Sequence, residues 1–213
     1  MSCHVVSTGH ENLRRLNRRS GAEPCTLPAR VIALLLLAVM LPRGLREQPP
    51  PLFQADVQAV YIFDFAKFVR WPAGSDQGPL VICVAAPKVY ADTLSKIVAG
   101  ENIAGRGVAV RSVQTSGDTA GCSILFVDVS AKDRLTDLLA ATSGKPVLTV
   151  SDIPGFLDRG GMVQFVTIDN RVRFSIALGP AARGNLSLSS QLLKVAVKVS
   201  GKPGNGGEHN DAQ

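Results

Sequence analysis

The sequence predicts an α/β layered domain with a mixed, partly parallel sheet flanked by helices and a C-terminal antiparallel hairpin plus closing helix. Short apolar segments alternate with segments of helical periodicity over residues 80–150, and such alternation is typical of strand–helix–strand units. Two strand-like segments then follow each other across Asp169 and Asn170, and a helical stripe comes last. The chain therefore combines parallel units with one hairpin.

The first expected element is a helix over residues 55–69. Apolar side chains recur there at the spacing of one helix face, namely Val57, Tyr61, Phe65 and Phe68. The Trp71-Pro72 pair ends the helix, because proline disfavours helical geometry in the residue before it. The rings at positions 61, 63 and 65 also alternate, so a strand is the alternative.

Five of the eleven aromatic residues lie within residues 61–72. A segment so rich in rings either anchors the core or contacts a partner. The helical stripe is expected to pack into the core. Phe63 and Asp64 lie off its centre and Trp71 stands at its end, so we expect these three to form the exposed remainder where a partner would bind.

Strands and helices are expected to alternate in the middle of the chain. The strands are residues 80–85, 108–113, 122–129 and 146–150, and the helices are residues 87–100 and 132–141. Gly100 is the C-cap of the first of these helices. The segment 122–129 is apolar almost throughout, which predicts a strand in the middle of the sheet.

A hairpin and a helix are expected at the C-terminal end. The strands 162–168 and 172–178 are joined by Asp169 and Asn170, which readily accept a positive φ. The closing helix has Ser187 or Ser189 as its N-cap. Its expected apolar face consists of Leu188, Leu192, Val195 and Val199.

Composition divides the chain into a basic leader (residues 1–54), one domain (55–200) and a disordered tail (201–213). Residues 1–54 hold seven of the 23 basic and three of the 17 acidic residues, so four of the six net positive charges lie there. The rest of the chain is nearly neutral and has no basic block, which argues against nucleic-acid binding.

The leader contains an uncharged apolar run at residues 31–41, preceded by arginines. Eleven residues are too few for the roughly 20 that span a bilayer, but they suit the apolar core of a secretory signal. The sequence therefore predicts export, with a retained membrane anchor as the alternative.

Two cysteines, Cys83 and Cys122, lie in the predicted domain, while Cys3 and Cys25 lie in the leader. In an exported chain this even number indicates a disulfide, whereas in the cytosol the same residues would be buried thiols. Their spacing excludes a CxxC redox motif and a zinc ribbon.

The predicted domain lacks histidine, because His4, His10 and His209 lie in the leader or the tail. Its absence excludes Ser/His and Cys/His nucleophilic pairs and histidine-ligated metals. We therefore expect no catalytic site, no metal and no cofactor, which leaves binding as the default function.

Four charged residues are candidates for ligand or partner contacts. Asp128 and Asp152 each follow a strand, where ligands bind in open α/β sheets. The alternative is that they cap the loops that follow. Arg171 and Arg173 alternate along one strand, so they face the same side and could bind an anion or an acidic partner. The alternative is a solvated strand face.

Residues 61–72 resemble the opening segment of the YfiR family, and further segments match in order. These are residues 80–84, 122–127, 147–152, 160–165, 171–176 and 181–194. The resemblance covers about residues 55–200 and implies a periplasmic α/β protein without catalytic activity.

The resemblance also implies a function and a disulfide. The family binds the periplasmic sensory part of an inner-membrane diguanylate cyclase and holds it inactive, which lowers cyclic di-GMP and biofilm formation. We expect this chain to act in the same way, as a homodimer. Cys83 and Cys122 match the strand cysteines of the family, which implies that they are bridged. The alternative is a periplasmic small-ligand-binding sensor that acts with another membrane signalling protein.

Overall fold

The computed structural model describes residues 51–75 and 78–201. The predicted signal run, the leader cysteines and nearly all of the predicted tail lie outside these residues. The first helix, α2 (Pro51–Phe68), begins four residues before the predicted start of the domain. Among the described residues, none of the helices combines the length and the apolarity that a membrane crossing requires.

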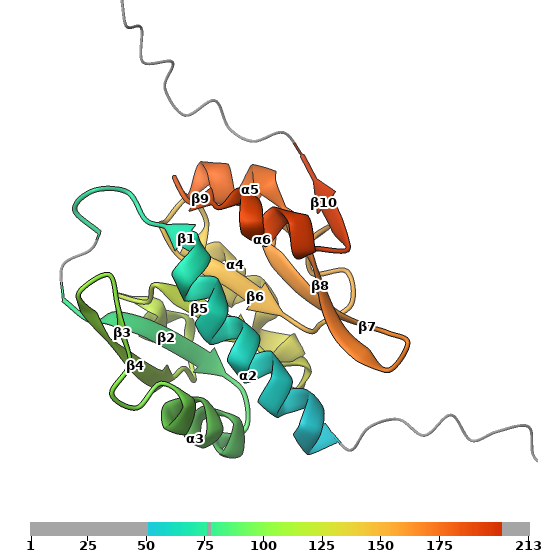
Figure 1. The fold of residues 1–213 in the computed structure, drawn as a ribbon, viewed down its shortest axis with the longest axis horizontal. Coiled ribbons are helices and arrows are strands. Elements are labelled where there is room, and N and C mark those ends of the chain that lie inside the picture. The colour runs from blue at the N-terminus through green and yellow to red at the C-terminus, as the bar shows by residue number, and fades with distance from the viewer. Residues whose placement is uncertain (1–50, 76–77, 202–213) are drawn as a thin grey trace, which may run out of the picture. The chain divides into compact units, whose positions relative to one another are not determined.

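Helices and strands alternate along most of the described chain (Figure 1). After α2 the helical elements are α3 (Lys88–Ile97), η1 (Ser116–Thr119), η2 (Val129–Arg134), α4 (Leu135–Thr142), α5 (Leu178–Arg183) and α6 (Ser190–Val195), of which η1 and η2 are 3₁₀ helices. The strands are β1 (Val69–Arg70), β2 (Leu80–Ala85), β3 (Asn102–Ile103), β4 (Arg106–Ser112), β5 (Ile124–Val127), β6 (Leu148–Ser151), β7 (Val163–Ile168), β8 (Arg171–Ala177), β9 (Ser187–Leu188) and β10 (Lys198–Ser200).

One mixed sheet of eight strands has the order β10-β8-β7-β6-β5-β2-β4-β3. Its central strands β4, β2, β5, β6 and β7 are parallel, whereas β7 pairs with β8 and β3 with β4 in the antiparallel sense. The chain passes from β2 to β4 on one side and returns to β5 on the other, so the strand order reverses between β2 and β5. In open α/β sheets such a reversal leaves a crevice at the carboxyl ends of the strands.

Helices cover both faces of the sheet, and each face has its own apolar core. In Figure 1, α2 and α3 lie in front of the sheet and α4 lies behind it. Alternate side chains of β5 pack into the two cores. Ile124 and Phe126 face α2 and α3, while Leu125 and Val127 face α4. All four are fully buried, which confirms the prediction that this strand lies in the middle of the sheet.

The helix predicted over residues 55–69 is confirmed as α2, but its buried face is shifted from the predicted stripe, of which Val57, Tyr61 and Phe68 are only half-buried. Phe65 is buried as expected, and Ile62 and Phe63 are also only 0% and 7% exposed. The expectation that Phe63 is exposed is therefore wrong. The reason is that α2 contacts α3 on one side and α6 and β8 on the other, so residues beyond a single stripe are covered.

The hairpin is confirmed as β7 and β8, and Asp169 and Asn170 have φ values of 48° and 61°. The predicted helix over residues 132–141 is confirmed from Leu135 onward, while the residues before it form η2. At the start of η1, the Asp118 carboxylate accepts hydrogen bonds from the Thr115 amide at 2.8 Å and from the Thr115 hydroxyl at 3.0 Å.

The prediction of one closing helix that includes Leu188 and Val199 is wrong. Ser189 is the N-cap, since its Oγ accepts a hydrogen bond from the Leu192 amide, but α6 ends at Val195. Leu188 lies in β9, which pairs with β1, and Val199 lies in β10, which pairs with β8. These pairings with distant strands satisfy backbone groups that a longer helix would have bonded internally. The sequence prediction also missed α5, whose residues follow β8 directly.

The predicted bridge between Cys83 and Cys122 is present. It joins the middle of β2 to the residues just before β5, and the two Cα atoms are 5.7 Å apart. The Arg111 Nη2 atom lies 3.5 Å from both sulfur atoms. The disulfide thus ties together two neighbouring central strands and closes the connection that contains α3 and β4.

Candidate functional site

The predicted carboxylates lie at the carboxyl ends of adjacent parallel strands. Asp128 follows β5 and its amide donates to the Ala85 carbonyl of β2 at 3.0 Å, beside the reversal of strand order. Asp152 follows β6, the next strand. Tyr90, in the first turn of α3, is close enough for both carboxylates to affect its pKa. Strand order therefore brings together groups that lie far apart in the sequence.

The two aspartates play different structural parts. The Asp128 Oδ1 atom accepts a hydrogen bond from the Ser130 amide at 2.8 Å and so caps η2. In contrast, the Asp152 Oδ1 atom and the Tyr90 hydroxyl are buried without a hydrogen-bond partner among the described residues. Buried polar atoms in folded proteins nearly always have partners. This pair is therefore the chemically unusual feature of the strand ends.

Electrostatics at the strand ends favour a neutral Tyr90 and weaken the acidity of Asp152. Burial, with the charge of Asp128 second, raises the pKa of Asp152 to about 6, although the Val129 amide and the Gln58 side chain act in the opposite direction. Burial and the two carboxylates raise the pKa of Tyr90. Near neutral pH the strand ends thus carry a mostly ionised Asp152 carboxylate, which can accept hydrogen bonds, and a neutral Tyr90 phenol, which can donate one.

A pocket of about 370 Å³ opens beside Asp152. Polar lining comes from this carboxylate and from the carboxamides of Gln54, Gln58 and Gln164, and apolar lining includes Phe165 and Val172. Such a lining could bind a small molecule through its hydrogen-bond donors. Among residues 51–75 and 78–201, no three His, Cys, Asp or Glu side chains are grouped to hold a metal ion.

Asp152→Asn should stabilise the protein much more at pH 7.5 than at pH 4.5. The folded-state pKa of about 6 exceeds the value of about 3.9 in an unfolded chain, so the ionised carboxyl destabilises the fold increasingly as the pH rises from about 4 to about 6. We expect a gain on the order of 2 kcal/mol in the free energy of unfolding at pH 7.5.

Urea unfolding of Asp152→Asn at both pH values measures this effect. Asp158→Asn is the matched control, because Asp158 is exposed and its replacement makes the same chemical change. An equal stability change for Asp152→Asn at the two pH values would contradict the electrostatic explanation.

The predicted arginine pair lines a shallow groove of about 370 Å³ with Ile168, Asp169 and Val197. Arg171 is exposed and Arg173 is half-buried. Three valines near this groove, in α6 and β10 or between them, are also exposed: Val195 by 62%, Val197 by 47% and Val199 by 39%. This edge of the sheet therefore presents positive charge next to apolar side chains.

The other predicted contact residues are held within the domain. The Lys67 Nζ atom lies 4.1 Å from the centre of the Phe63 ring and 2.9 Å from the Asp64 Oδ1 atom. The half-buried Trp71 donates from Nε1 to the Ser123 carbonyl at 3.3 Å. Asp64 and Trp71 keep partial exposure, whereas Phe63 is covered.

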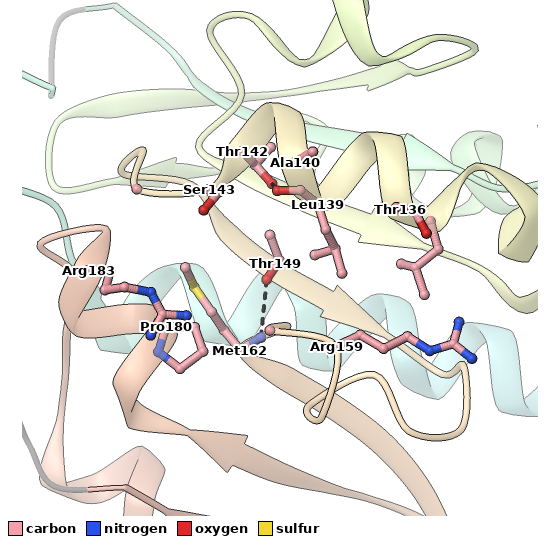
Figure 2. A pocket seen from close by; sticks show the side chains of 13 residues that line it. Thr136, Leu139, Ala140, Thr142, Ser143, Thr149, Arg159, Met162, Pro180 and Arg183 are labelled. Carbon is pink, nitrogen blue, oxygen red and sulfur yellow. Dashed lines mark hydrogen bonds between the residues drawn. The ribbon is translucent and has the colours of Figure 1, made fainter.

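A second pocket, of about 460 Å³, lies between α4, the start of β6, the loop before β7 and α5 (Figure 2). Its walls include Arg159, Arg183 and the hydroxyl residues Thr136, Ser143 and Thr149. The sequence prediction did not identify this pocket. Its residues come from four separate segments with no common motif, so only the run Arg159-Gly160-Gly161 before a strand could have drawn attention to it.

The mixed sheet and the helices on both its faces define an α/β domain. A family model described as YfiR/HmsC-like matches residues 55–197. The chain therefore belongs to the YfiR/HmsC-like family. This family is regulatory, and membership supports a periplasmic regulatory role that is connected, at the level of the family, with a diguanylate cyclase.

Two solved structures resemble the chain more distantly. One is a conserved domain protein from Vibrio cholerae, with 9% identity and a TM-score of 0.46. The other is the ABC domain of a Streptococcus pneumoniae protein in complex with L-Trp, with 11% identity and a TM-score of 0.43. Each match covers 68% of this chain and 60% of the other. At TM-scores below 0.5 these similarities assign neither fold nor function.

Proposed function

We propose that this chain is a periplasmic, non-catalytic regulator that binds an inner-membrane diguanylate cyclase and holds it inactive, thereby lowering cyclic di-GMP and biofilm formation. The observation that carries the proposal is the match to the YfiR/HmsC-like family over residues 55–197. In this proposal residues 1–54 direct export, residues 55–200 form the regulatory domain, and the protein acts as a homodimer.

Repression by contact sets a thermodynamic requirement. The regulator must bind the inactive state of the cyclase more tightly than the active state, because equal affinity for both would leave their populations unchanged. Shifting a two-state equilibrium from 1:99 to 99:1 needs about a 10⁴-fold difference in affinity. The contact surface must therefore include groups that meet the partner in only one of its states.

The arginine groove of β8 is the surface we assign to this contact. Arg171 and Arg173 line it together with Val197, and interfaces commonly combine arginine with apolar side chains. Asp64 and Trp71, which retain partial exposure, are secondary candidates, and the buried Phe63 contacts Lys67, which pairs with Asp64. An acidic patch on the periplasmic part of the cyclase would complement the groove.

Charge reversal tests the groove. Arg171→Glu/Arg173→Glu should abolish co-purification of the protein with its cyclase from detergent-solubilised membranes and raise cellular cyclic di-GMP. Lys96→Glu/Lys132→Glu is the matched control, because it makes the same charge change at exposed positions of α3 and η2. Equal binding by wild type and the Arg171/Arg173 variant would contradict the assigned surface.

Gene deletion tests the function itself. Removal of the protein should raise cyclic di-GMP only in cells whose cyclase is intact. A rise that persists when the cyclase gene is also deleted would refute direct repression.

A second candidate function is a small-ligand sensor that acts with a membrane signalling partner. The specific observation that favours it is the buried Asp152 Oδ1 atom, which has no hydrogen-bond partner among the described residues and belongs to a carboxylate that lines a polar pocket. A ligand that donates to Asp152 would satisfy a group that otherwise costs stability. The partner could then respond to the ligand-bound form.

A further inference from the structure

We propose that the pocket between α4 and α5 binds a small organic anion, with the charged group of the ligand at the Arg183 end and its apolar body over Leu139 and Met162. This inference is separate from the proposed contact with a cyclase. It rests on the lining of the pocket, on unused hydrogen-bond donors and on the distribution of charge around the pocket.

The lining is positive and partly apolar. Thirteen residues line the pocket, and these described residues include two arginines but no Asp or Glu. Leu135, Leu139, Met162 and Pro180 supply the apolar part. A volume of about 460 Å³ suits a small molecule, since ligand pockets span roughly 300–1,000 Å³.

The two arginines are not engaged elsewhere in the described part of the chain. Arg106, Arg111 and Arg134 each donate to backbone carbonyls. Within residues 51–75 and 78–201, the side chains of Arg159 and Arg183 make no hydrogen bond or ion pair. A guanidinium offers five donors in a fixed planar arrangement, which suits carboxylate and phosphate groups.

Thr149 places a further donor inside the pocket. Its side chain is 2% exposed, and its Oγ1 atom accepts from the Met162 amide at 3.1 Å, the bond drawn as a dashed line in Figure 2. The Met162 amide bonds the Thr149 hydroxyl instead of a β6 carbonyl, because β6 pairs with β7 only at Val150 and Ser151. The Thr149 hydroxyl proton has no acceptor among the described residues, so it can be donated to a ligand oxygen.

Charge distinguishes the two ends of the pocket. In Figure 2 the Arg183 guanidinium lies beside Pro180, while Arg159 extends toward the opposite end, below Thr136. Asp158 adjoins Arg159 in the chain and Asp137 adjoins Thr136. No acidic residue adjoins Arg183 in the chain, and the backbone of Lys145 packs on the neighbouring Gly184, so we place the anion at the Arg183 end.

The Arg183 end is also held in place by the fold. Gly184, which follows α5, packs so closely on the Lys145 carbonyl that an added Cβ would lie 2.5 Å from that oxygen. This contact fixes the C-terminal end of α5 beside residues 143–145. At the end of α4 the carbonyls of Ala140 and Thr142 accept hydrogen bonds from the amides of Ser143 and Lys145, which orders the backbone on this side of the pocket.

Binding of benzoate, phenyl phosphate and benzamide by isothermal titration calorimetry tests the proposal. Benzamide has nearly the shape of benzoate but no charge. We expect both anions to bind and benzamide to bind at least about tenfold more weakly, since a lost charge-assisted hydrogen bond costs at least that factor. A preference for benzoate over phenyl phosphate, or the reverse, then identifies the anionic group that the site selects.

Substitutions locate the anion. Arg183→Gln should weaken benzoate binding about tenfold or more, Arg159→Gln should weaken it less, and Arg183→Lys should give an intermediate affinity. The matched control, Arg70→Gln, makes the same chemical change at an exposed position outside the pocket and should bind benzoate like wild type. Thermal unfolding of each variant verifies that it is folded.

Three results would overturn the proposal. These are absence of binding by either anion at millimolar concentration, equal affinity for benzamide and benzoate, and a loss in the Arg70→Gln control as large as that in Arg183→Gln. None of these results bears on cyclase repression, which is measured by co-purification and cyclic di-GMP.

Discussion

Phe65→Ala is expected to lower the free energy of unfolding by about 4 kcal/mol, because removal of a fully buried ring loses both its burial and its packing contacts. Phe65 is 1% exposed. Its ring centroid lies 4.9 Å from that of Phe174 and 5.8 Å from that of Phe165. The substitution would thus open a cavity where α2 meets the hairpin of β7 and β8.

Urea unfolding of Phe65→Ala at constant pH measures this loss. Val60→Ala is the matched control, since Val60 lies on the same helix but is 46% exposed, and its replacement should change stability by only about 0.5 kcal/mol. A loss below about 1 kcal/mol for Phe65→Ala would show that α2 does not anchor the core as the packing implies.

Cys83→Ala/Cys122→Ala should cost about 4 kcal/mol of stability relative to the oxidised wild type. The bridge spans a sequence separation of 39 residues. Closing a loop of about 40 residues lowers the entropy of the unfolded chain, which raises its free energy by roughly this amount. The effect is large because the closed loop is long.

Reductant provides an internal comparison for the disulfide. Dithiothreitol should move the urea midpoint of the wild type toward that of the double variant and leave the double variant unchanged. Mass analysis of periplasmic wild type without reductant should find the two cysteines inaccessible to alkylation. If reduction leaves the wild-type midpoint unchanged, the bridge does not contribute the expected stability.

Several elements were predictable because a local pattern specifies them. The continuous apolar run of residues 122–129 led to the central strand β5, and Asp169 and Asn170 led to the hairpin of β7 and β8. The helical periodicity of residues 55–69 led to α2. In each case the periodicity or the turn residues lie within one short segment, so no distant contact is needed to recognise the element.

The C-terminal segment was predicted less well because distant contacts decide its structure. Leu188 and Val199 fit the face of one long helix, but pairing of β9 with β1 and of β10 with β8 divides the segment. Strand pairing across more than 100 residues, as between Val69 and Leu188, leaves no periodic signal in either strand. Local propensity yields to such tertiary contacts.

The candidate site was predictable only in part. The positions of Asp128 and Asp152 after strands indicated the carboxyl edge of the sheet, but their neighbours were not indicated. Only the fold brings Tyr90 and Gln58 toward Asp152, leaves the Asp152 Oδ1 atom without a partner, and uses Asp128 as a cap. The arginine and hydroxyl residues of the second pocket are likewise assembled by packing.

The sequence by itself determined the family, the α/β class, the central strands and the cysteine pair, because apolar periodicity and short ordered segments encode these features locally. Only the tertiary structure decided how far α2 is buried, which helices and strands follow β8, and which polar groups line the two pockets. The physical reason is that burial and hydrogen-bond satisfaction depend on which neighbour covers a residue, and those neighbours come from distant parts of the chain.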